Sequence, residues 1–236
     1  MWFPQRADLR VGLCPDRLVT ADSVDASRDP LVDLRALAKS TRVTLILSYH
    51  FVRYTVLPWS PALKSAHEWL ALAKHSFSST YGSVATRWRV MVSPNRTGAA
   101  RVATAVDEEL VQCIRAIPNV VSVRPYLMAA FNARRHALKN ASAWFVIQEA
   151  GRLTVCLIAK GAWRAIRLRR AESEWQPTLA DLLQRETLAG ADRGAERVFL
   201  CCEDEPPRAA GRYLLEDVTL PRGIDPALRQ RVMTLH

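Results

Sequence analysis

The chain has 236 residues, of which 49% are hydrophobic and 24% charged, proportions typical of a folded globular protein and not of a disordered one. Its 33 basic and 23 acidic residues give a formal net charge of +10, which favours an anionic partner such as nucleic acid, anionic lipid or an acidic protein. The length allows one large domain or two small ones.

The cysteines and the N-terminal residues indicate the cellular compartment in which the protein is expected. The five cysteines have no C-x-x-C spacing, so they support neither a disulfide framework nor a zinc site. The opening MWFPQRADLRVGL shows no signal-peptide pattern, and no stretch approaches the roughly 18 apolar residues that span a bilayer. We therefore expect a cytoplasmic protein with no membrane span of its own.

The first 60 residues predict short strands around one helix. Residues 8–25 read as two strands joined at Cys14-Pro15-Asp16, and 31–40 as a short helix. The run 43–48 is almost wholly apolar, as in a strand buried on both faces, whereas 50–57 alternates apolar and polar residues. We expect these last two strands to pair as a hairpin, the first central and the second half exposed.

A long amphipathic helix and a further set of elements follow. Ser60-Pro61 is typical of a helix start and Gly82 of its end. The segment 83–139 then predicts strand, strand, helix, strand, helix, with Asp107 opening the first of its helices and Pro125 the second. We interpret it as a module inserted into a first lobe, residues 1–140.

The remaining residues, 141–236, predict a second lobe. Three consecutive strands are separated by Gly151 and Gly161 and are followed by a helix and a buried strand. The tail from Glu203 is rich in Pro and Arg and reads as irregular, with one strand-like piece. The ranges, in order, are 143–148, 152–159, 162–169, 177–190, 196–201 and 213–220.

No catalytic signature is present. The chain has no G-x-x-x-x-G-K-[ST] phosphate loop, no G-x-G-x-x-G, no G-x-S-x-G and no H-E-x-x-H. The five histidines are scattered along the sequence. We therefore predict no catalytic residue and no metal site from motifs alone.

Three segments carry a resemblance to a known family: 43-VTLILSYHFVRYTVLPW-59 with the long helix after it, 102-VATAVDEELVQCIRAIPNVVSVRPYLMAAF-131, and 144-WFVIQEAGRLTVCLIAKGAWR-164. In the order of their elements they resemble PilM and the cytoplasmic domain of GspL, assembly-platform proteins of type IV pili and type II secretion. The resemblance implies an α/β chain with the duplicated ribonuclease H-like (actin-like) fold, mixed sheets flanked by helices, and a truncated second half.

In actin-like ATPases, each half begins with a strand-turn-strand that wraps phosphates and carries an acidic residue for the metal. The equivalent turns here depart from that pattern, since Gln148 stands where the second acid belongs and 189-AGADRGAE-196 has no adjacent glycines. If ATP and magnesium were bound, the resemblance would place them at Gly12, Asp16, Glu149, Gly151 and Thr154. Because the turns are degenerate, we expect no cofactor and no enzymatic activity.

The resemblance favours a non-enzymatic cytoplasmic scaffold, attached to the inner membrane through a partner. Its implied partners are the cytoplasmic tail of a PilN-like membrane protein, an assembly ATPase and further copies of the chain. The residues that we expect to contact the tail are Val52, Tyr54, Val56 and Trp59.

Two alternatives remain open at this stage. One is an actin-like ATPase that binds and hydrolyses ATP. The other is a basic nucleic-acid-binding module, although the densest arginine cluster, 164–170, distributes its charges over both faces of a predicted strand. Nucleic acid is therefore the less favoured partner.

Overall fold

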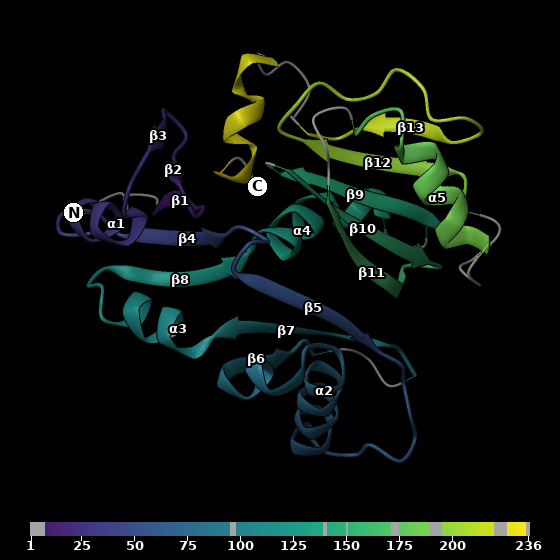
Figure 1. Ribbon diagram of the computed structural model, residues 1–236, viewed down its shortest axis with the longest axis horizontal. Coiled ribbons are helices and arrows are strands. Elements are labelled where there is room, and N and C mark those ends of the chain that lie inside the picture. The colour runs from purple at the N-terminus through teal and green to yellow at the C-terminus, as the bar shows by residue number, and fades with distance from the viewer. Residues whose placement is uncertain are drawn as a thin grey trace, which may run out of the picture.

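The computed structural model describes residues 8–94, 98–138, 141–149, 151–170, 175–188, 195–219 and 226–234. These residues form two five-stranded sheets and one three-stranded sheet, with helices packed around them (Figure 1). None of the described helices is both long enough and apolar enough to cross a membrane.

The first lobe is built on a mixed sheet in the order β3-β2-β1-β4-β8. β1 pairs in parallel with β4 and β4 with β8, while β2 pairs antiparallel with both β1 and β3. All five residues of β4 are buried, as its apolar sequence predicts. The elements are β1 (Leu9–Leu13), β2 (Arg17–Val19), β3 (Val24–Ala26), α1 (Pro30–Leu37), β4 (Val43–Leu47), β8 (Val120–Pro125) and α4 (Tyr126–Leu138).

The second lobe repeats this arrangement in the order β11-β10-β9-β12-β13. Its first three strands are antiparallel and its last two pairings are parallel, and one helix connects β11 to β12 as α1 connects β3 to β4. The duplicated α/β fold is therefore confirmed. The elements are β9 (Ala143–Glu149), β10 (Arg152–Ala159), β11 (Ala162–Arg170), α5 (Leu179–Leu188), β12 (Arg197–Cys202) and β13 (Leu214–Asp217).

A small antiparallel sheet, in the order β5-β7-β6, extends the first lobe. One of its faces packs against α2 through Trp69, Ala73 and Phe77. The elements are β5 (Val52–Leu57), α2 (Ala66–Tyr81), the 3₁₀ helix η1 (Gly82–Arg87), β6 (Trp88–Val92), β7 (Arg101–Asp107) and α3 (Glu108–Arg115).

The predicted hairpin of 43–48 with 50–57 is wrong. β4 already has a parallel partner on each side, β1 and β8, so it has no edge left to offer to β5. β5 pairs with β7 instead. The alternation of 50–57 identified a strand correctly but carried no information about its partner.

Other boundaries also differ from the sequence prediction. The long helix begins at Ala66, where Ser65 and Glu68 form a reciprocal capping box, and Ser60 to Leu63 form a turn. Residues 8–25 contain three strands where two were predicted. The segment 83–139 is divided between two sheets, because β6 and β7 join β5 whereas β8 joins the first sheet.

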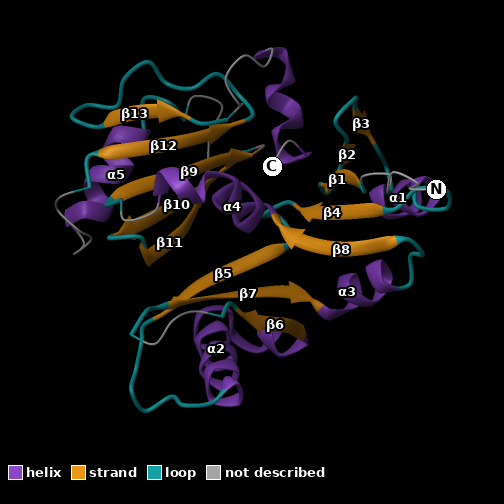
Figure 2. Cartoon of the chain, turned by 180° about the vertical axis from the view of Figure 1, so that it is seen from behind, coloured by secondary structure: helices purple, strands orange, loops and turns teal. Residues whose placement is uncertain are grey.

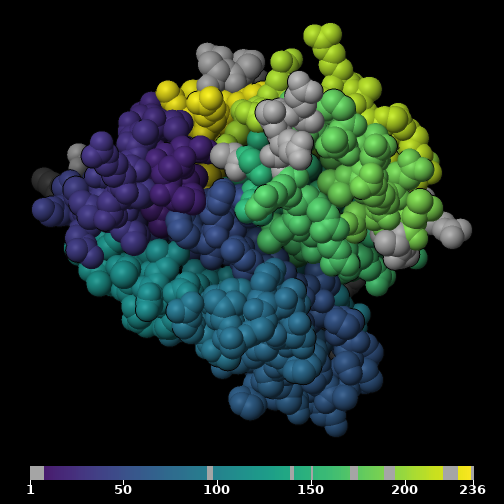
Figure 3. Space-filling model, in the orientation of Figure 1, coloured from purple at the N-terminus to yellow at the C-terminus, as the bar shows by residue number. Residues whose placement is uncertain are grey.

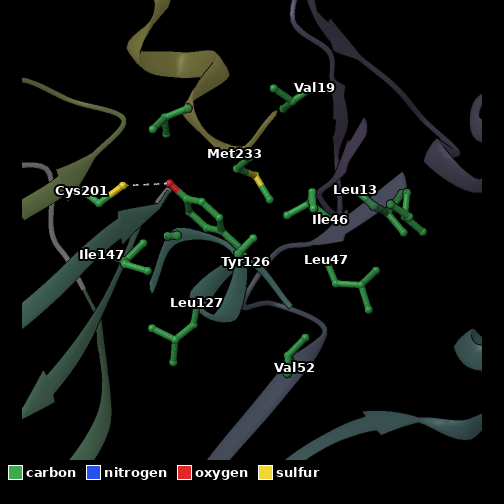
Figure 4. Close-up of a cluster of buried hydrophobic side chains, with 14 of the residues drawn as sticks. Leu13, Val19, Ile46, Leu47, Val52, Tyr126, Leu127, Ile147, Cys201 and Met233 are labelled. Atoms are coloured by element: carbon green, nitrogen blue, oxygen red, sulfur yellow. Dashed lines mark hydrogen bonds between the residues drawn. The ribbon is translucent and has the colours of Figure 1, made fainter. Parts of the chain in front are cut away.

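The largest hydrophobic cluster lies between the two lobes and draws on both (Figure 4). Tyr126 at the start of α4 is fully buried at its centre, and its hydroxyl lies 3.3 Å from the Cys201 sulfur of β12. Side chains from the first sheet and from the second surround it, among them Ile46 and Ile147. The lobes therefore share one core.

The C-terminal segment closes this core from one side. It forms a 3₁₀ helix, η2 (Pro226–Thr234), where an irregular tail was predicted. Val232 and Met233 are fully buried, and the Met233 sulfur lies 3.7 Å from that of Cys14. The C-terminal residues, yellow in Figure 3, lie between the first and second lobes.

We predict that Met233→Ala lowers the free energy of unfolding by about 3 kcal/mol, because it leaves a cavity between the lobes. Met91, 66% exposed, provides the matched control, since Met91→Ala should change stability by less than about 0.5 kcal/mol. Urea unfolding of both variants checks this, and equal losses would show that η2 contributes nothing to the core.

Candidate functional site

The two turns that correspond to phosphate-binding turns meet at the lobe interface. The β1–β2 turn and the end of β9 enclose a cavity of about 10 Å³, which is the space of about one water molecule. Its lining residues are Cys14, Pro15, Asp16, Arg17, Ser48, His50 and Glu149. Of the five predicted nucleotide residues, the structure places Asp16 and Glu149 at this cavity.

An ion pair between the lobes crosses beside the cavity. Arg17 Nη2 on β2 donates to Glu203 Oε2, just after β12, at 2.8 Å. The side chains are 20% and 7% exposed, so the pair is largely shielded from solvent. A shielded, charge-assisted contact of this kind holds the two lobes together beside the cavity.

Glu149 is buried at the end of β9. Its Oε2 accepts a hydrogen bond from the Tyr49 amide at 3.2 Å. Burial, with a smaller contribution from the negative charge of Glu203, raises the pKa of Glu149 to about 8. The carboxyl group is therefore mostly protonated at neutral pH in the chain without metal, and a magnesium ion would have to displace this proton before Glu149 could bind it.

Gln148 binds the chain that follows β12. Its Oε1 accepts from the amides of Glu203 and Asp204, each at 3.0 Å. Its Nε2 donates to Asp204 Oδ2 at 2.7 Å. The residue that stands where the second acid was expected thus has a structural role in the second lobe.

The other predicted nucleotide residues also have structural roles. A Cβ on Gly12 would lie 3.1 Å from Val19 Cβ and 3.3 Å from Met233 Sδ, so this glycine permits close packing of β2 and η2. Gly151 has a φ of 71° in the β9–β10 turn, and Thr154 is 2% exposed within β10. These residues do not fit a nucleoside triphosphate with its magnesium, and no hydrolytic step follows from them.

Two of the four residues expected to contact a partner are inaccessible. Val52 and Tyr54 are 0% and 6% exposed, because the face of β5 that carries them lies beside β11 of the second lobe (Figures 1 and 2). Val56 is half-buried, and Trp59 is 41% exposed in the loop after β5. Burial therefore keeps Val52 and Tyr54 from contacting a partner in this structure, whereas contacts through Val56 and Trp59 stay predictions.

The open part of that sheet face lies on β6. Tyr54 is opposite Thr104 of β7, and Thr104 is opposite Met91 of β6. An apolar groove of about 410 Å³ begins there and runs between the small sheet, α3 and β8. Its lining residues are Leu47, Arg89, Met91, Val92, Ser93, Pro94, Thr104, Val106, Val111, Ile114, Arg115, Val123, Pro125 and Met128.

Strand edges and exposed apolar side chains border this groove. β6 and β8 are the last strands of their sheets among the described residues, so each has one edge without a strand partner. Met91 is 66% exposed, and Val121 and Val123 on β8 are 43% and 44% exposed. Apolar side chains clustered beside such edges are typical of a protein-binding surface.

An ion pair fixes the wall of the groove. Arg89 on β6 binds Glu108 on α3 through two hydrogen bonds, each 2.8 Å long. These hydrogen bonds, with one from Gln112, lower the pKa of Glu108 to about 2. The sequence contains an indication of this surface. The residues 120–123 are apolar at three of four positions and so place apolar side chains on both faces of β8, whereas a strand covered on one face needs them on that face alone.

No protein-family model matches the chain, and no curated protein matches it in sequence. Solved structures do match. A Bacteroides thetaiotaomicron protein of unknown function with an actin-like ATPase fold has 10% identity and a TM-score of 0.59, covering 82% of this chain and 80% of its own.

Two further structures are similar over most of their lengths. The cytoplasmic domain of EpsL, an inner-membrane component of the type II secretion system of Vibrio cholerae, has 12% identity and a TM-score of 0.57, covering 96% of this chain and 92% of that domain. A PilM–PilN type IV pilus biogenesis complex has 12% identity and a TM-score of 0.55, with coverages of 84% and 82%. The chain therefore has the actin-like ATPase fold.

Proposed function

We propose that the chain is a non-enzymatic scaffold of a pilus or secretion inner-membrane platform, and that its groove holds the cytoplasmic tail of a PilN-like membrane protein. The observation that carries this proposal is the apolar groove bordered by the free edges of β6 and β8. The chain would then lie at the cytoplasmic face of the inner membrane through its partner.

An extended tail suits this groove chemically. Main-chain groups of the tail would pair with the free edge of β6 or β8, which supplies affinity. Alternate side chains of a strand point to the same side, so every second tail residue would enter the apolar cavity beside Met91 and Val123. The tail is therefore expected to alternate apolar residues along its bound stretch.

The lobe interface supports a role without nucleotide hydrolysis. The cavity at the turns has room for about one water molecule, Glu149 is neutral at pH 7, and Arg17 pairs with Glu203 across the lobes. Each of these features would have to change before ATP and magnesium could enter.

Similarity to the EpsL domain and to the PilM–PilN complex adds support at the level of fold. The complex shows that a protein with this architecture assembles with PilN. Contact with an assembly ATPase and self-association of the chain stay predictions.

The basic cluster of β11 gives little support to nucleic-acid binding. Arg169 Nη2 lies 2.5 Å from Glu186 Oε1 on α5, and Arg167 Nε lies 3.5 Å from Glu186 Oε2. One carboxylate thus partly neutralises the two arginines. Filter binding at low and high salt tests this alternative, which predicts a steep loss of affinity with salt.

Calorimetric titration tests the proposal. The cytoplasmic tail peptide of the membrane protein encoded by the neighbouring gene should bind the chain at one site, and magnesium-ATP at high protein concentration should give no binding heat. Heat from magnesium-ATP together with no binding of the tail would favour the ATPase alternative and contradict the scaffold.

A further inference from the structure

The groove continues into a second cavity. This cavity, of about 720 Å³, shares Ser93, Pro94 and Met128 with the first. It extends along α4 toward the turn between β10 and β11, where Gly161 and Trp163 line it. A segment bound beside Met91 can therefore pass Met128 and enter the second cavity without leaving the surface.

The second cavity differs from the first in its chemistry. Phe131 and Trp163 form an aromatic wall, with ring centroids 4.5 Å apart. Asn132, Arg135 and His136, all exposed on α4, add polar and basic groups. The described lining of the two cavities contains no acidic residue, so its charge favours an anionic ligand.

Arg135 brings a positive charge to the second cavity. No salt bridge between described residues involves Arg135 or His136. Arg89 in the first cavity is already bound to Glu108, and Arg134 donates to the Val218 carbonyl at 2.9 and 2.6 Å. Arg135, in contrast, is one of the residues that line the second cavity.

We infer that the second cavity binds acidic side chains of the same tail, next to the apolar stretch that fills the first cavity. This inference rests on the proposed function and adds a specificity to it: the partner's tail carries Asp or Glu at the end of its bound stretch. Charge complementarity would also fix the direction of the tail, because only one end reaches Arg135.

Synthetic peptides test the inference directly. Each peptide has the same core of alternating apolar residues and carries two Glu, two Gln or two Lys at one end, with the pair at either end in separate peptides. In one orientation we expect the Glu peptide to bind about five-fold more tightly than the Gln peptide at about 50 mM salt, with the difference falling at about 300 mM. Fluorescence anisotropy measures each dissociation constant.

Matched variants distinguish binding of the apolar stretch in the first cavity from the preference for acidic residues in the second. The double variant R135Q/H136Q should remove the preference for Glu and leave the affinity for the Gln peptide unchanged, whereas R164Q, an exposed arginine on β11 outside both cavities, should change neither. M91E should weaken every peptide.

Three results would overturn the inference. Equal affinities for the Glu and Gln peptides in both orientations, all lost in M91E, would leave the tail groove intact and refute the acidic preference. A preference for Glu that survives R135Q/H136Q would place the acidic site elsewhere. If neither these peptides nor the neighbouring membrane protein's tail binds, the proposed function fails as well.

Discussion

Replacing Val123 by Glu should weaken binding of the partner's tail by about 100-fold. The side chain lines the groove, and a carboxylate there would replace an apolar group that the bound tail covers. Burying the carboxylate under the tail costs several kcal/mol of desolvation even though Arg115 lines the same groove, and a net cost of about 3 kcal/mol corresponds to that loss of affinity. Calorimetric titration of the tail peptide against the wild type and the variant measures it.

The same substitution elsewhere provides the control. Val32 on α1 is 57% exposed and lines neither cavity of the groove, so Val32→Glu should bind the tail as the wild type does. Because Val123 is 44% exposed in the free chain, its variant should also keep its unfolding transition. Equal affinities for both variants would place the tail on another surface.

Stability should fall as the pH rises from about 5 to about 8 because of Glu149. Burial raises the pKa of this carboxyl from 4.5 to about 8 in the folded chain. Between those values the folded state keeps a proton that the unfolded state releases, so the free energy of unfolding decreases by about 1.4 kcal/mol per pH unit. The stabilising effect is complete below about pH 4.5 and is lost as the pH rises toward 8.

Glu149→Gln isolates this effect from that of other titrating groups. The amide is neutral at every pH and keeps an oxygen to accept from the Tyr49 amide. The stability of the variant relative to the wild type should therefore increase with pH across this range, as urea unfolding at several pH values would show. Parallel stability curves for the two proteins would mean that Glu149 is ionised in the folded chain.

Much of the fold was predictable because the burial of an element determines the local pattern of apolar residues in its sequence. Residues 43–47 are apolar throughout because β4 is covered on both faces and lies between two strands. Asp107 caps α3 by accepting from the Glu109 amide at 2.9 Å, as the acids at that helix start predicted. These features depend on neighbouring residues alone.

Strand partners were not predictable, because pairing depends on which edges remain free. The sequence placed β5 beside β4, its neighbour in the chain, yet both edges of β4 were occupied by β1 and β8. The helix η2 read as irregular for another reason: its buried apolar residues, Val232 and Met233, are adjacent in the sequence and set no helical period.

The candidate site illustrates the limit most clearly. The face of the small sheet that carries Val52, Tyr54 and Val56 is also the face that opens into the apolar groove, but the second lobe covers it at β5 and leaves it open at β6. The residues of β5 themselves do not indicate that the second lobe buries this part of the face. The departure of the second turn from the actin-like pattern, in contrast, is visible in the sequence itself, because Gln148 stands in the place of an acid.

Hydrogen–deuterium exchange of the chain, alone and with each ligand, tests the central claim most directly. The tail peptide of the neighbouring membrane protein should slow exchange in β6 and β8, the strands that border the groove, while magnesium-ATP should slow exchange nowhere. Slower exchange at the β1–β2 and β9–β10 turns with magnesium-ATP, and none in β6 or β8 with the tail, would contradict the account.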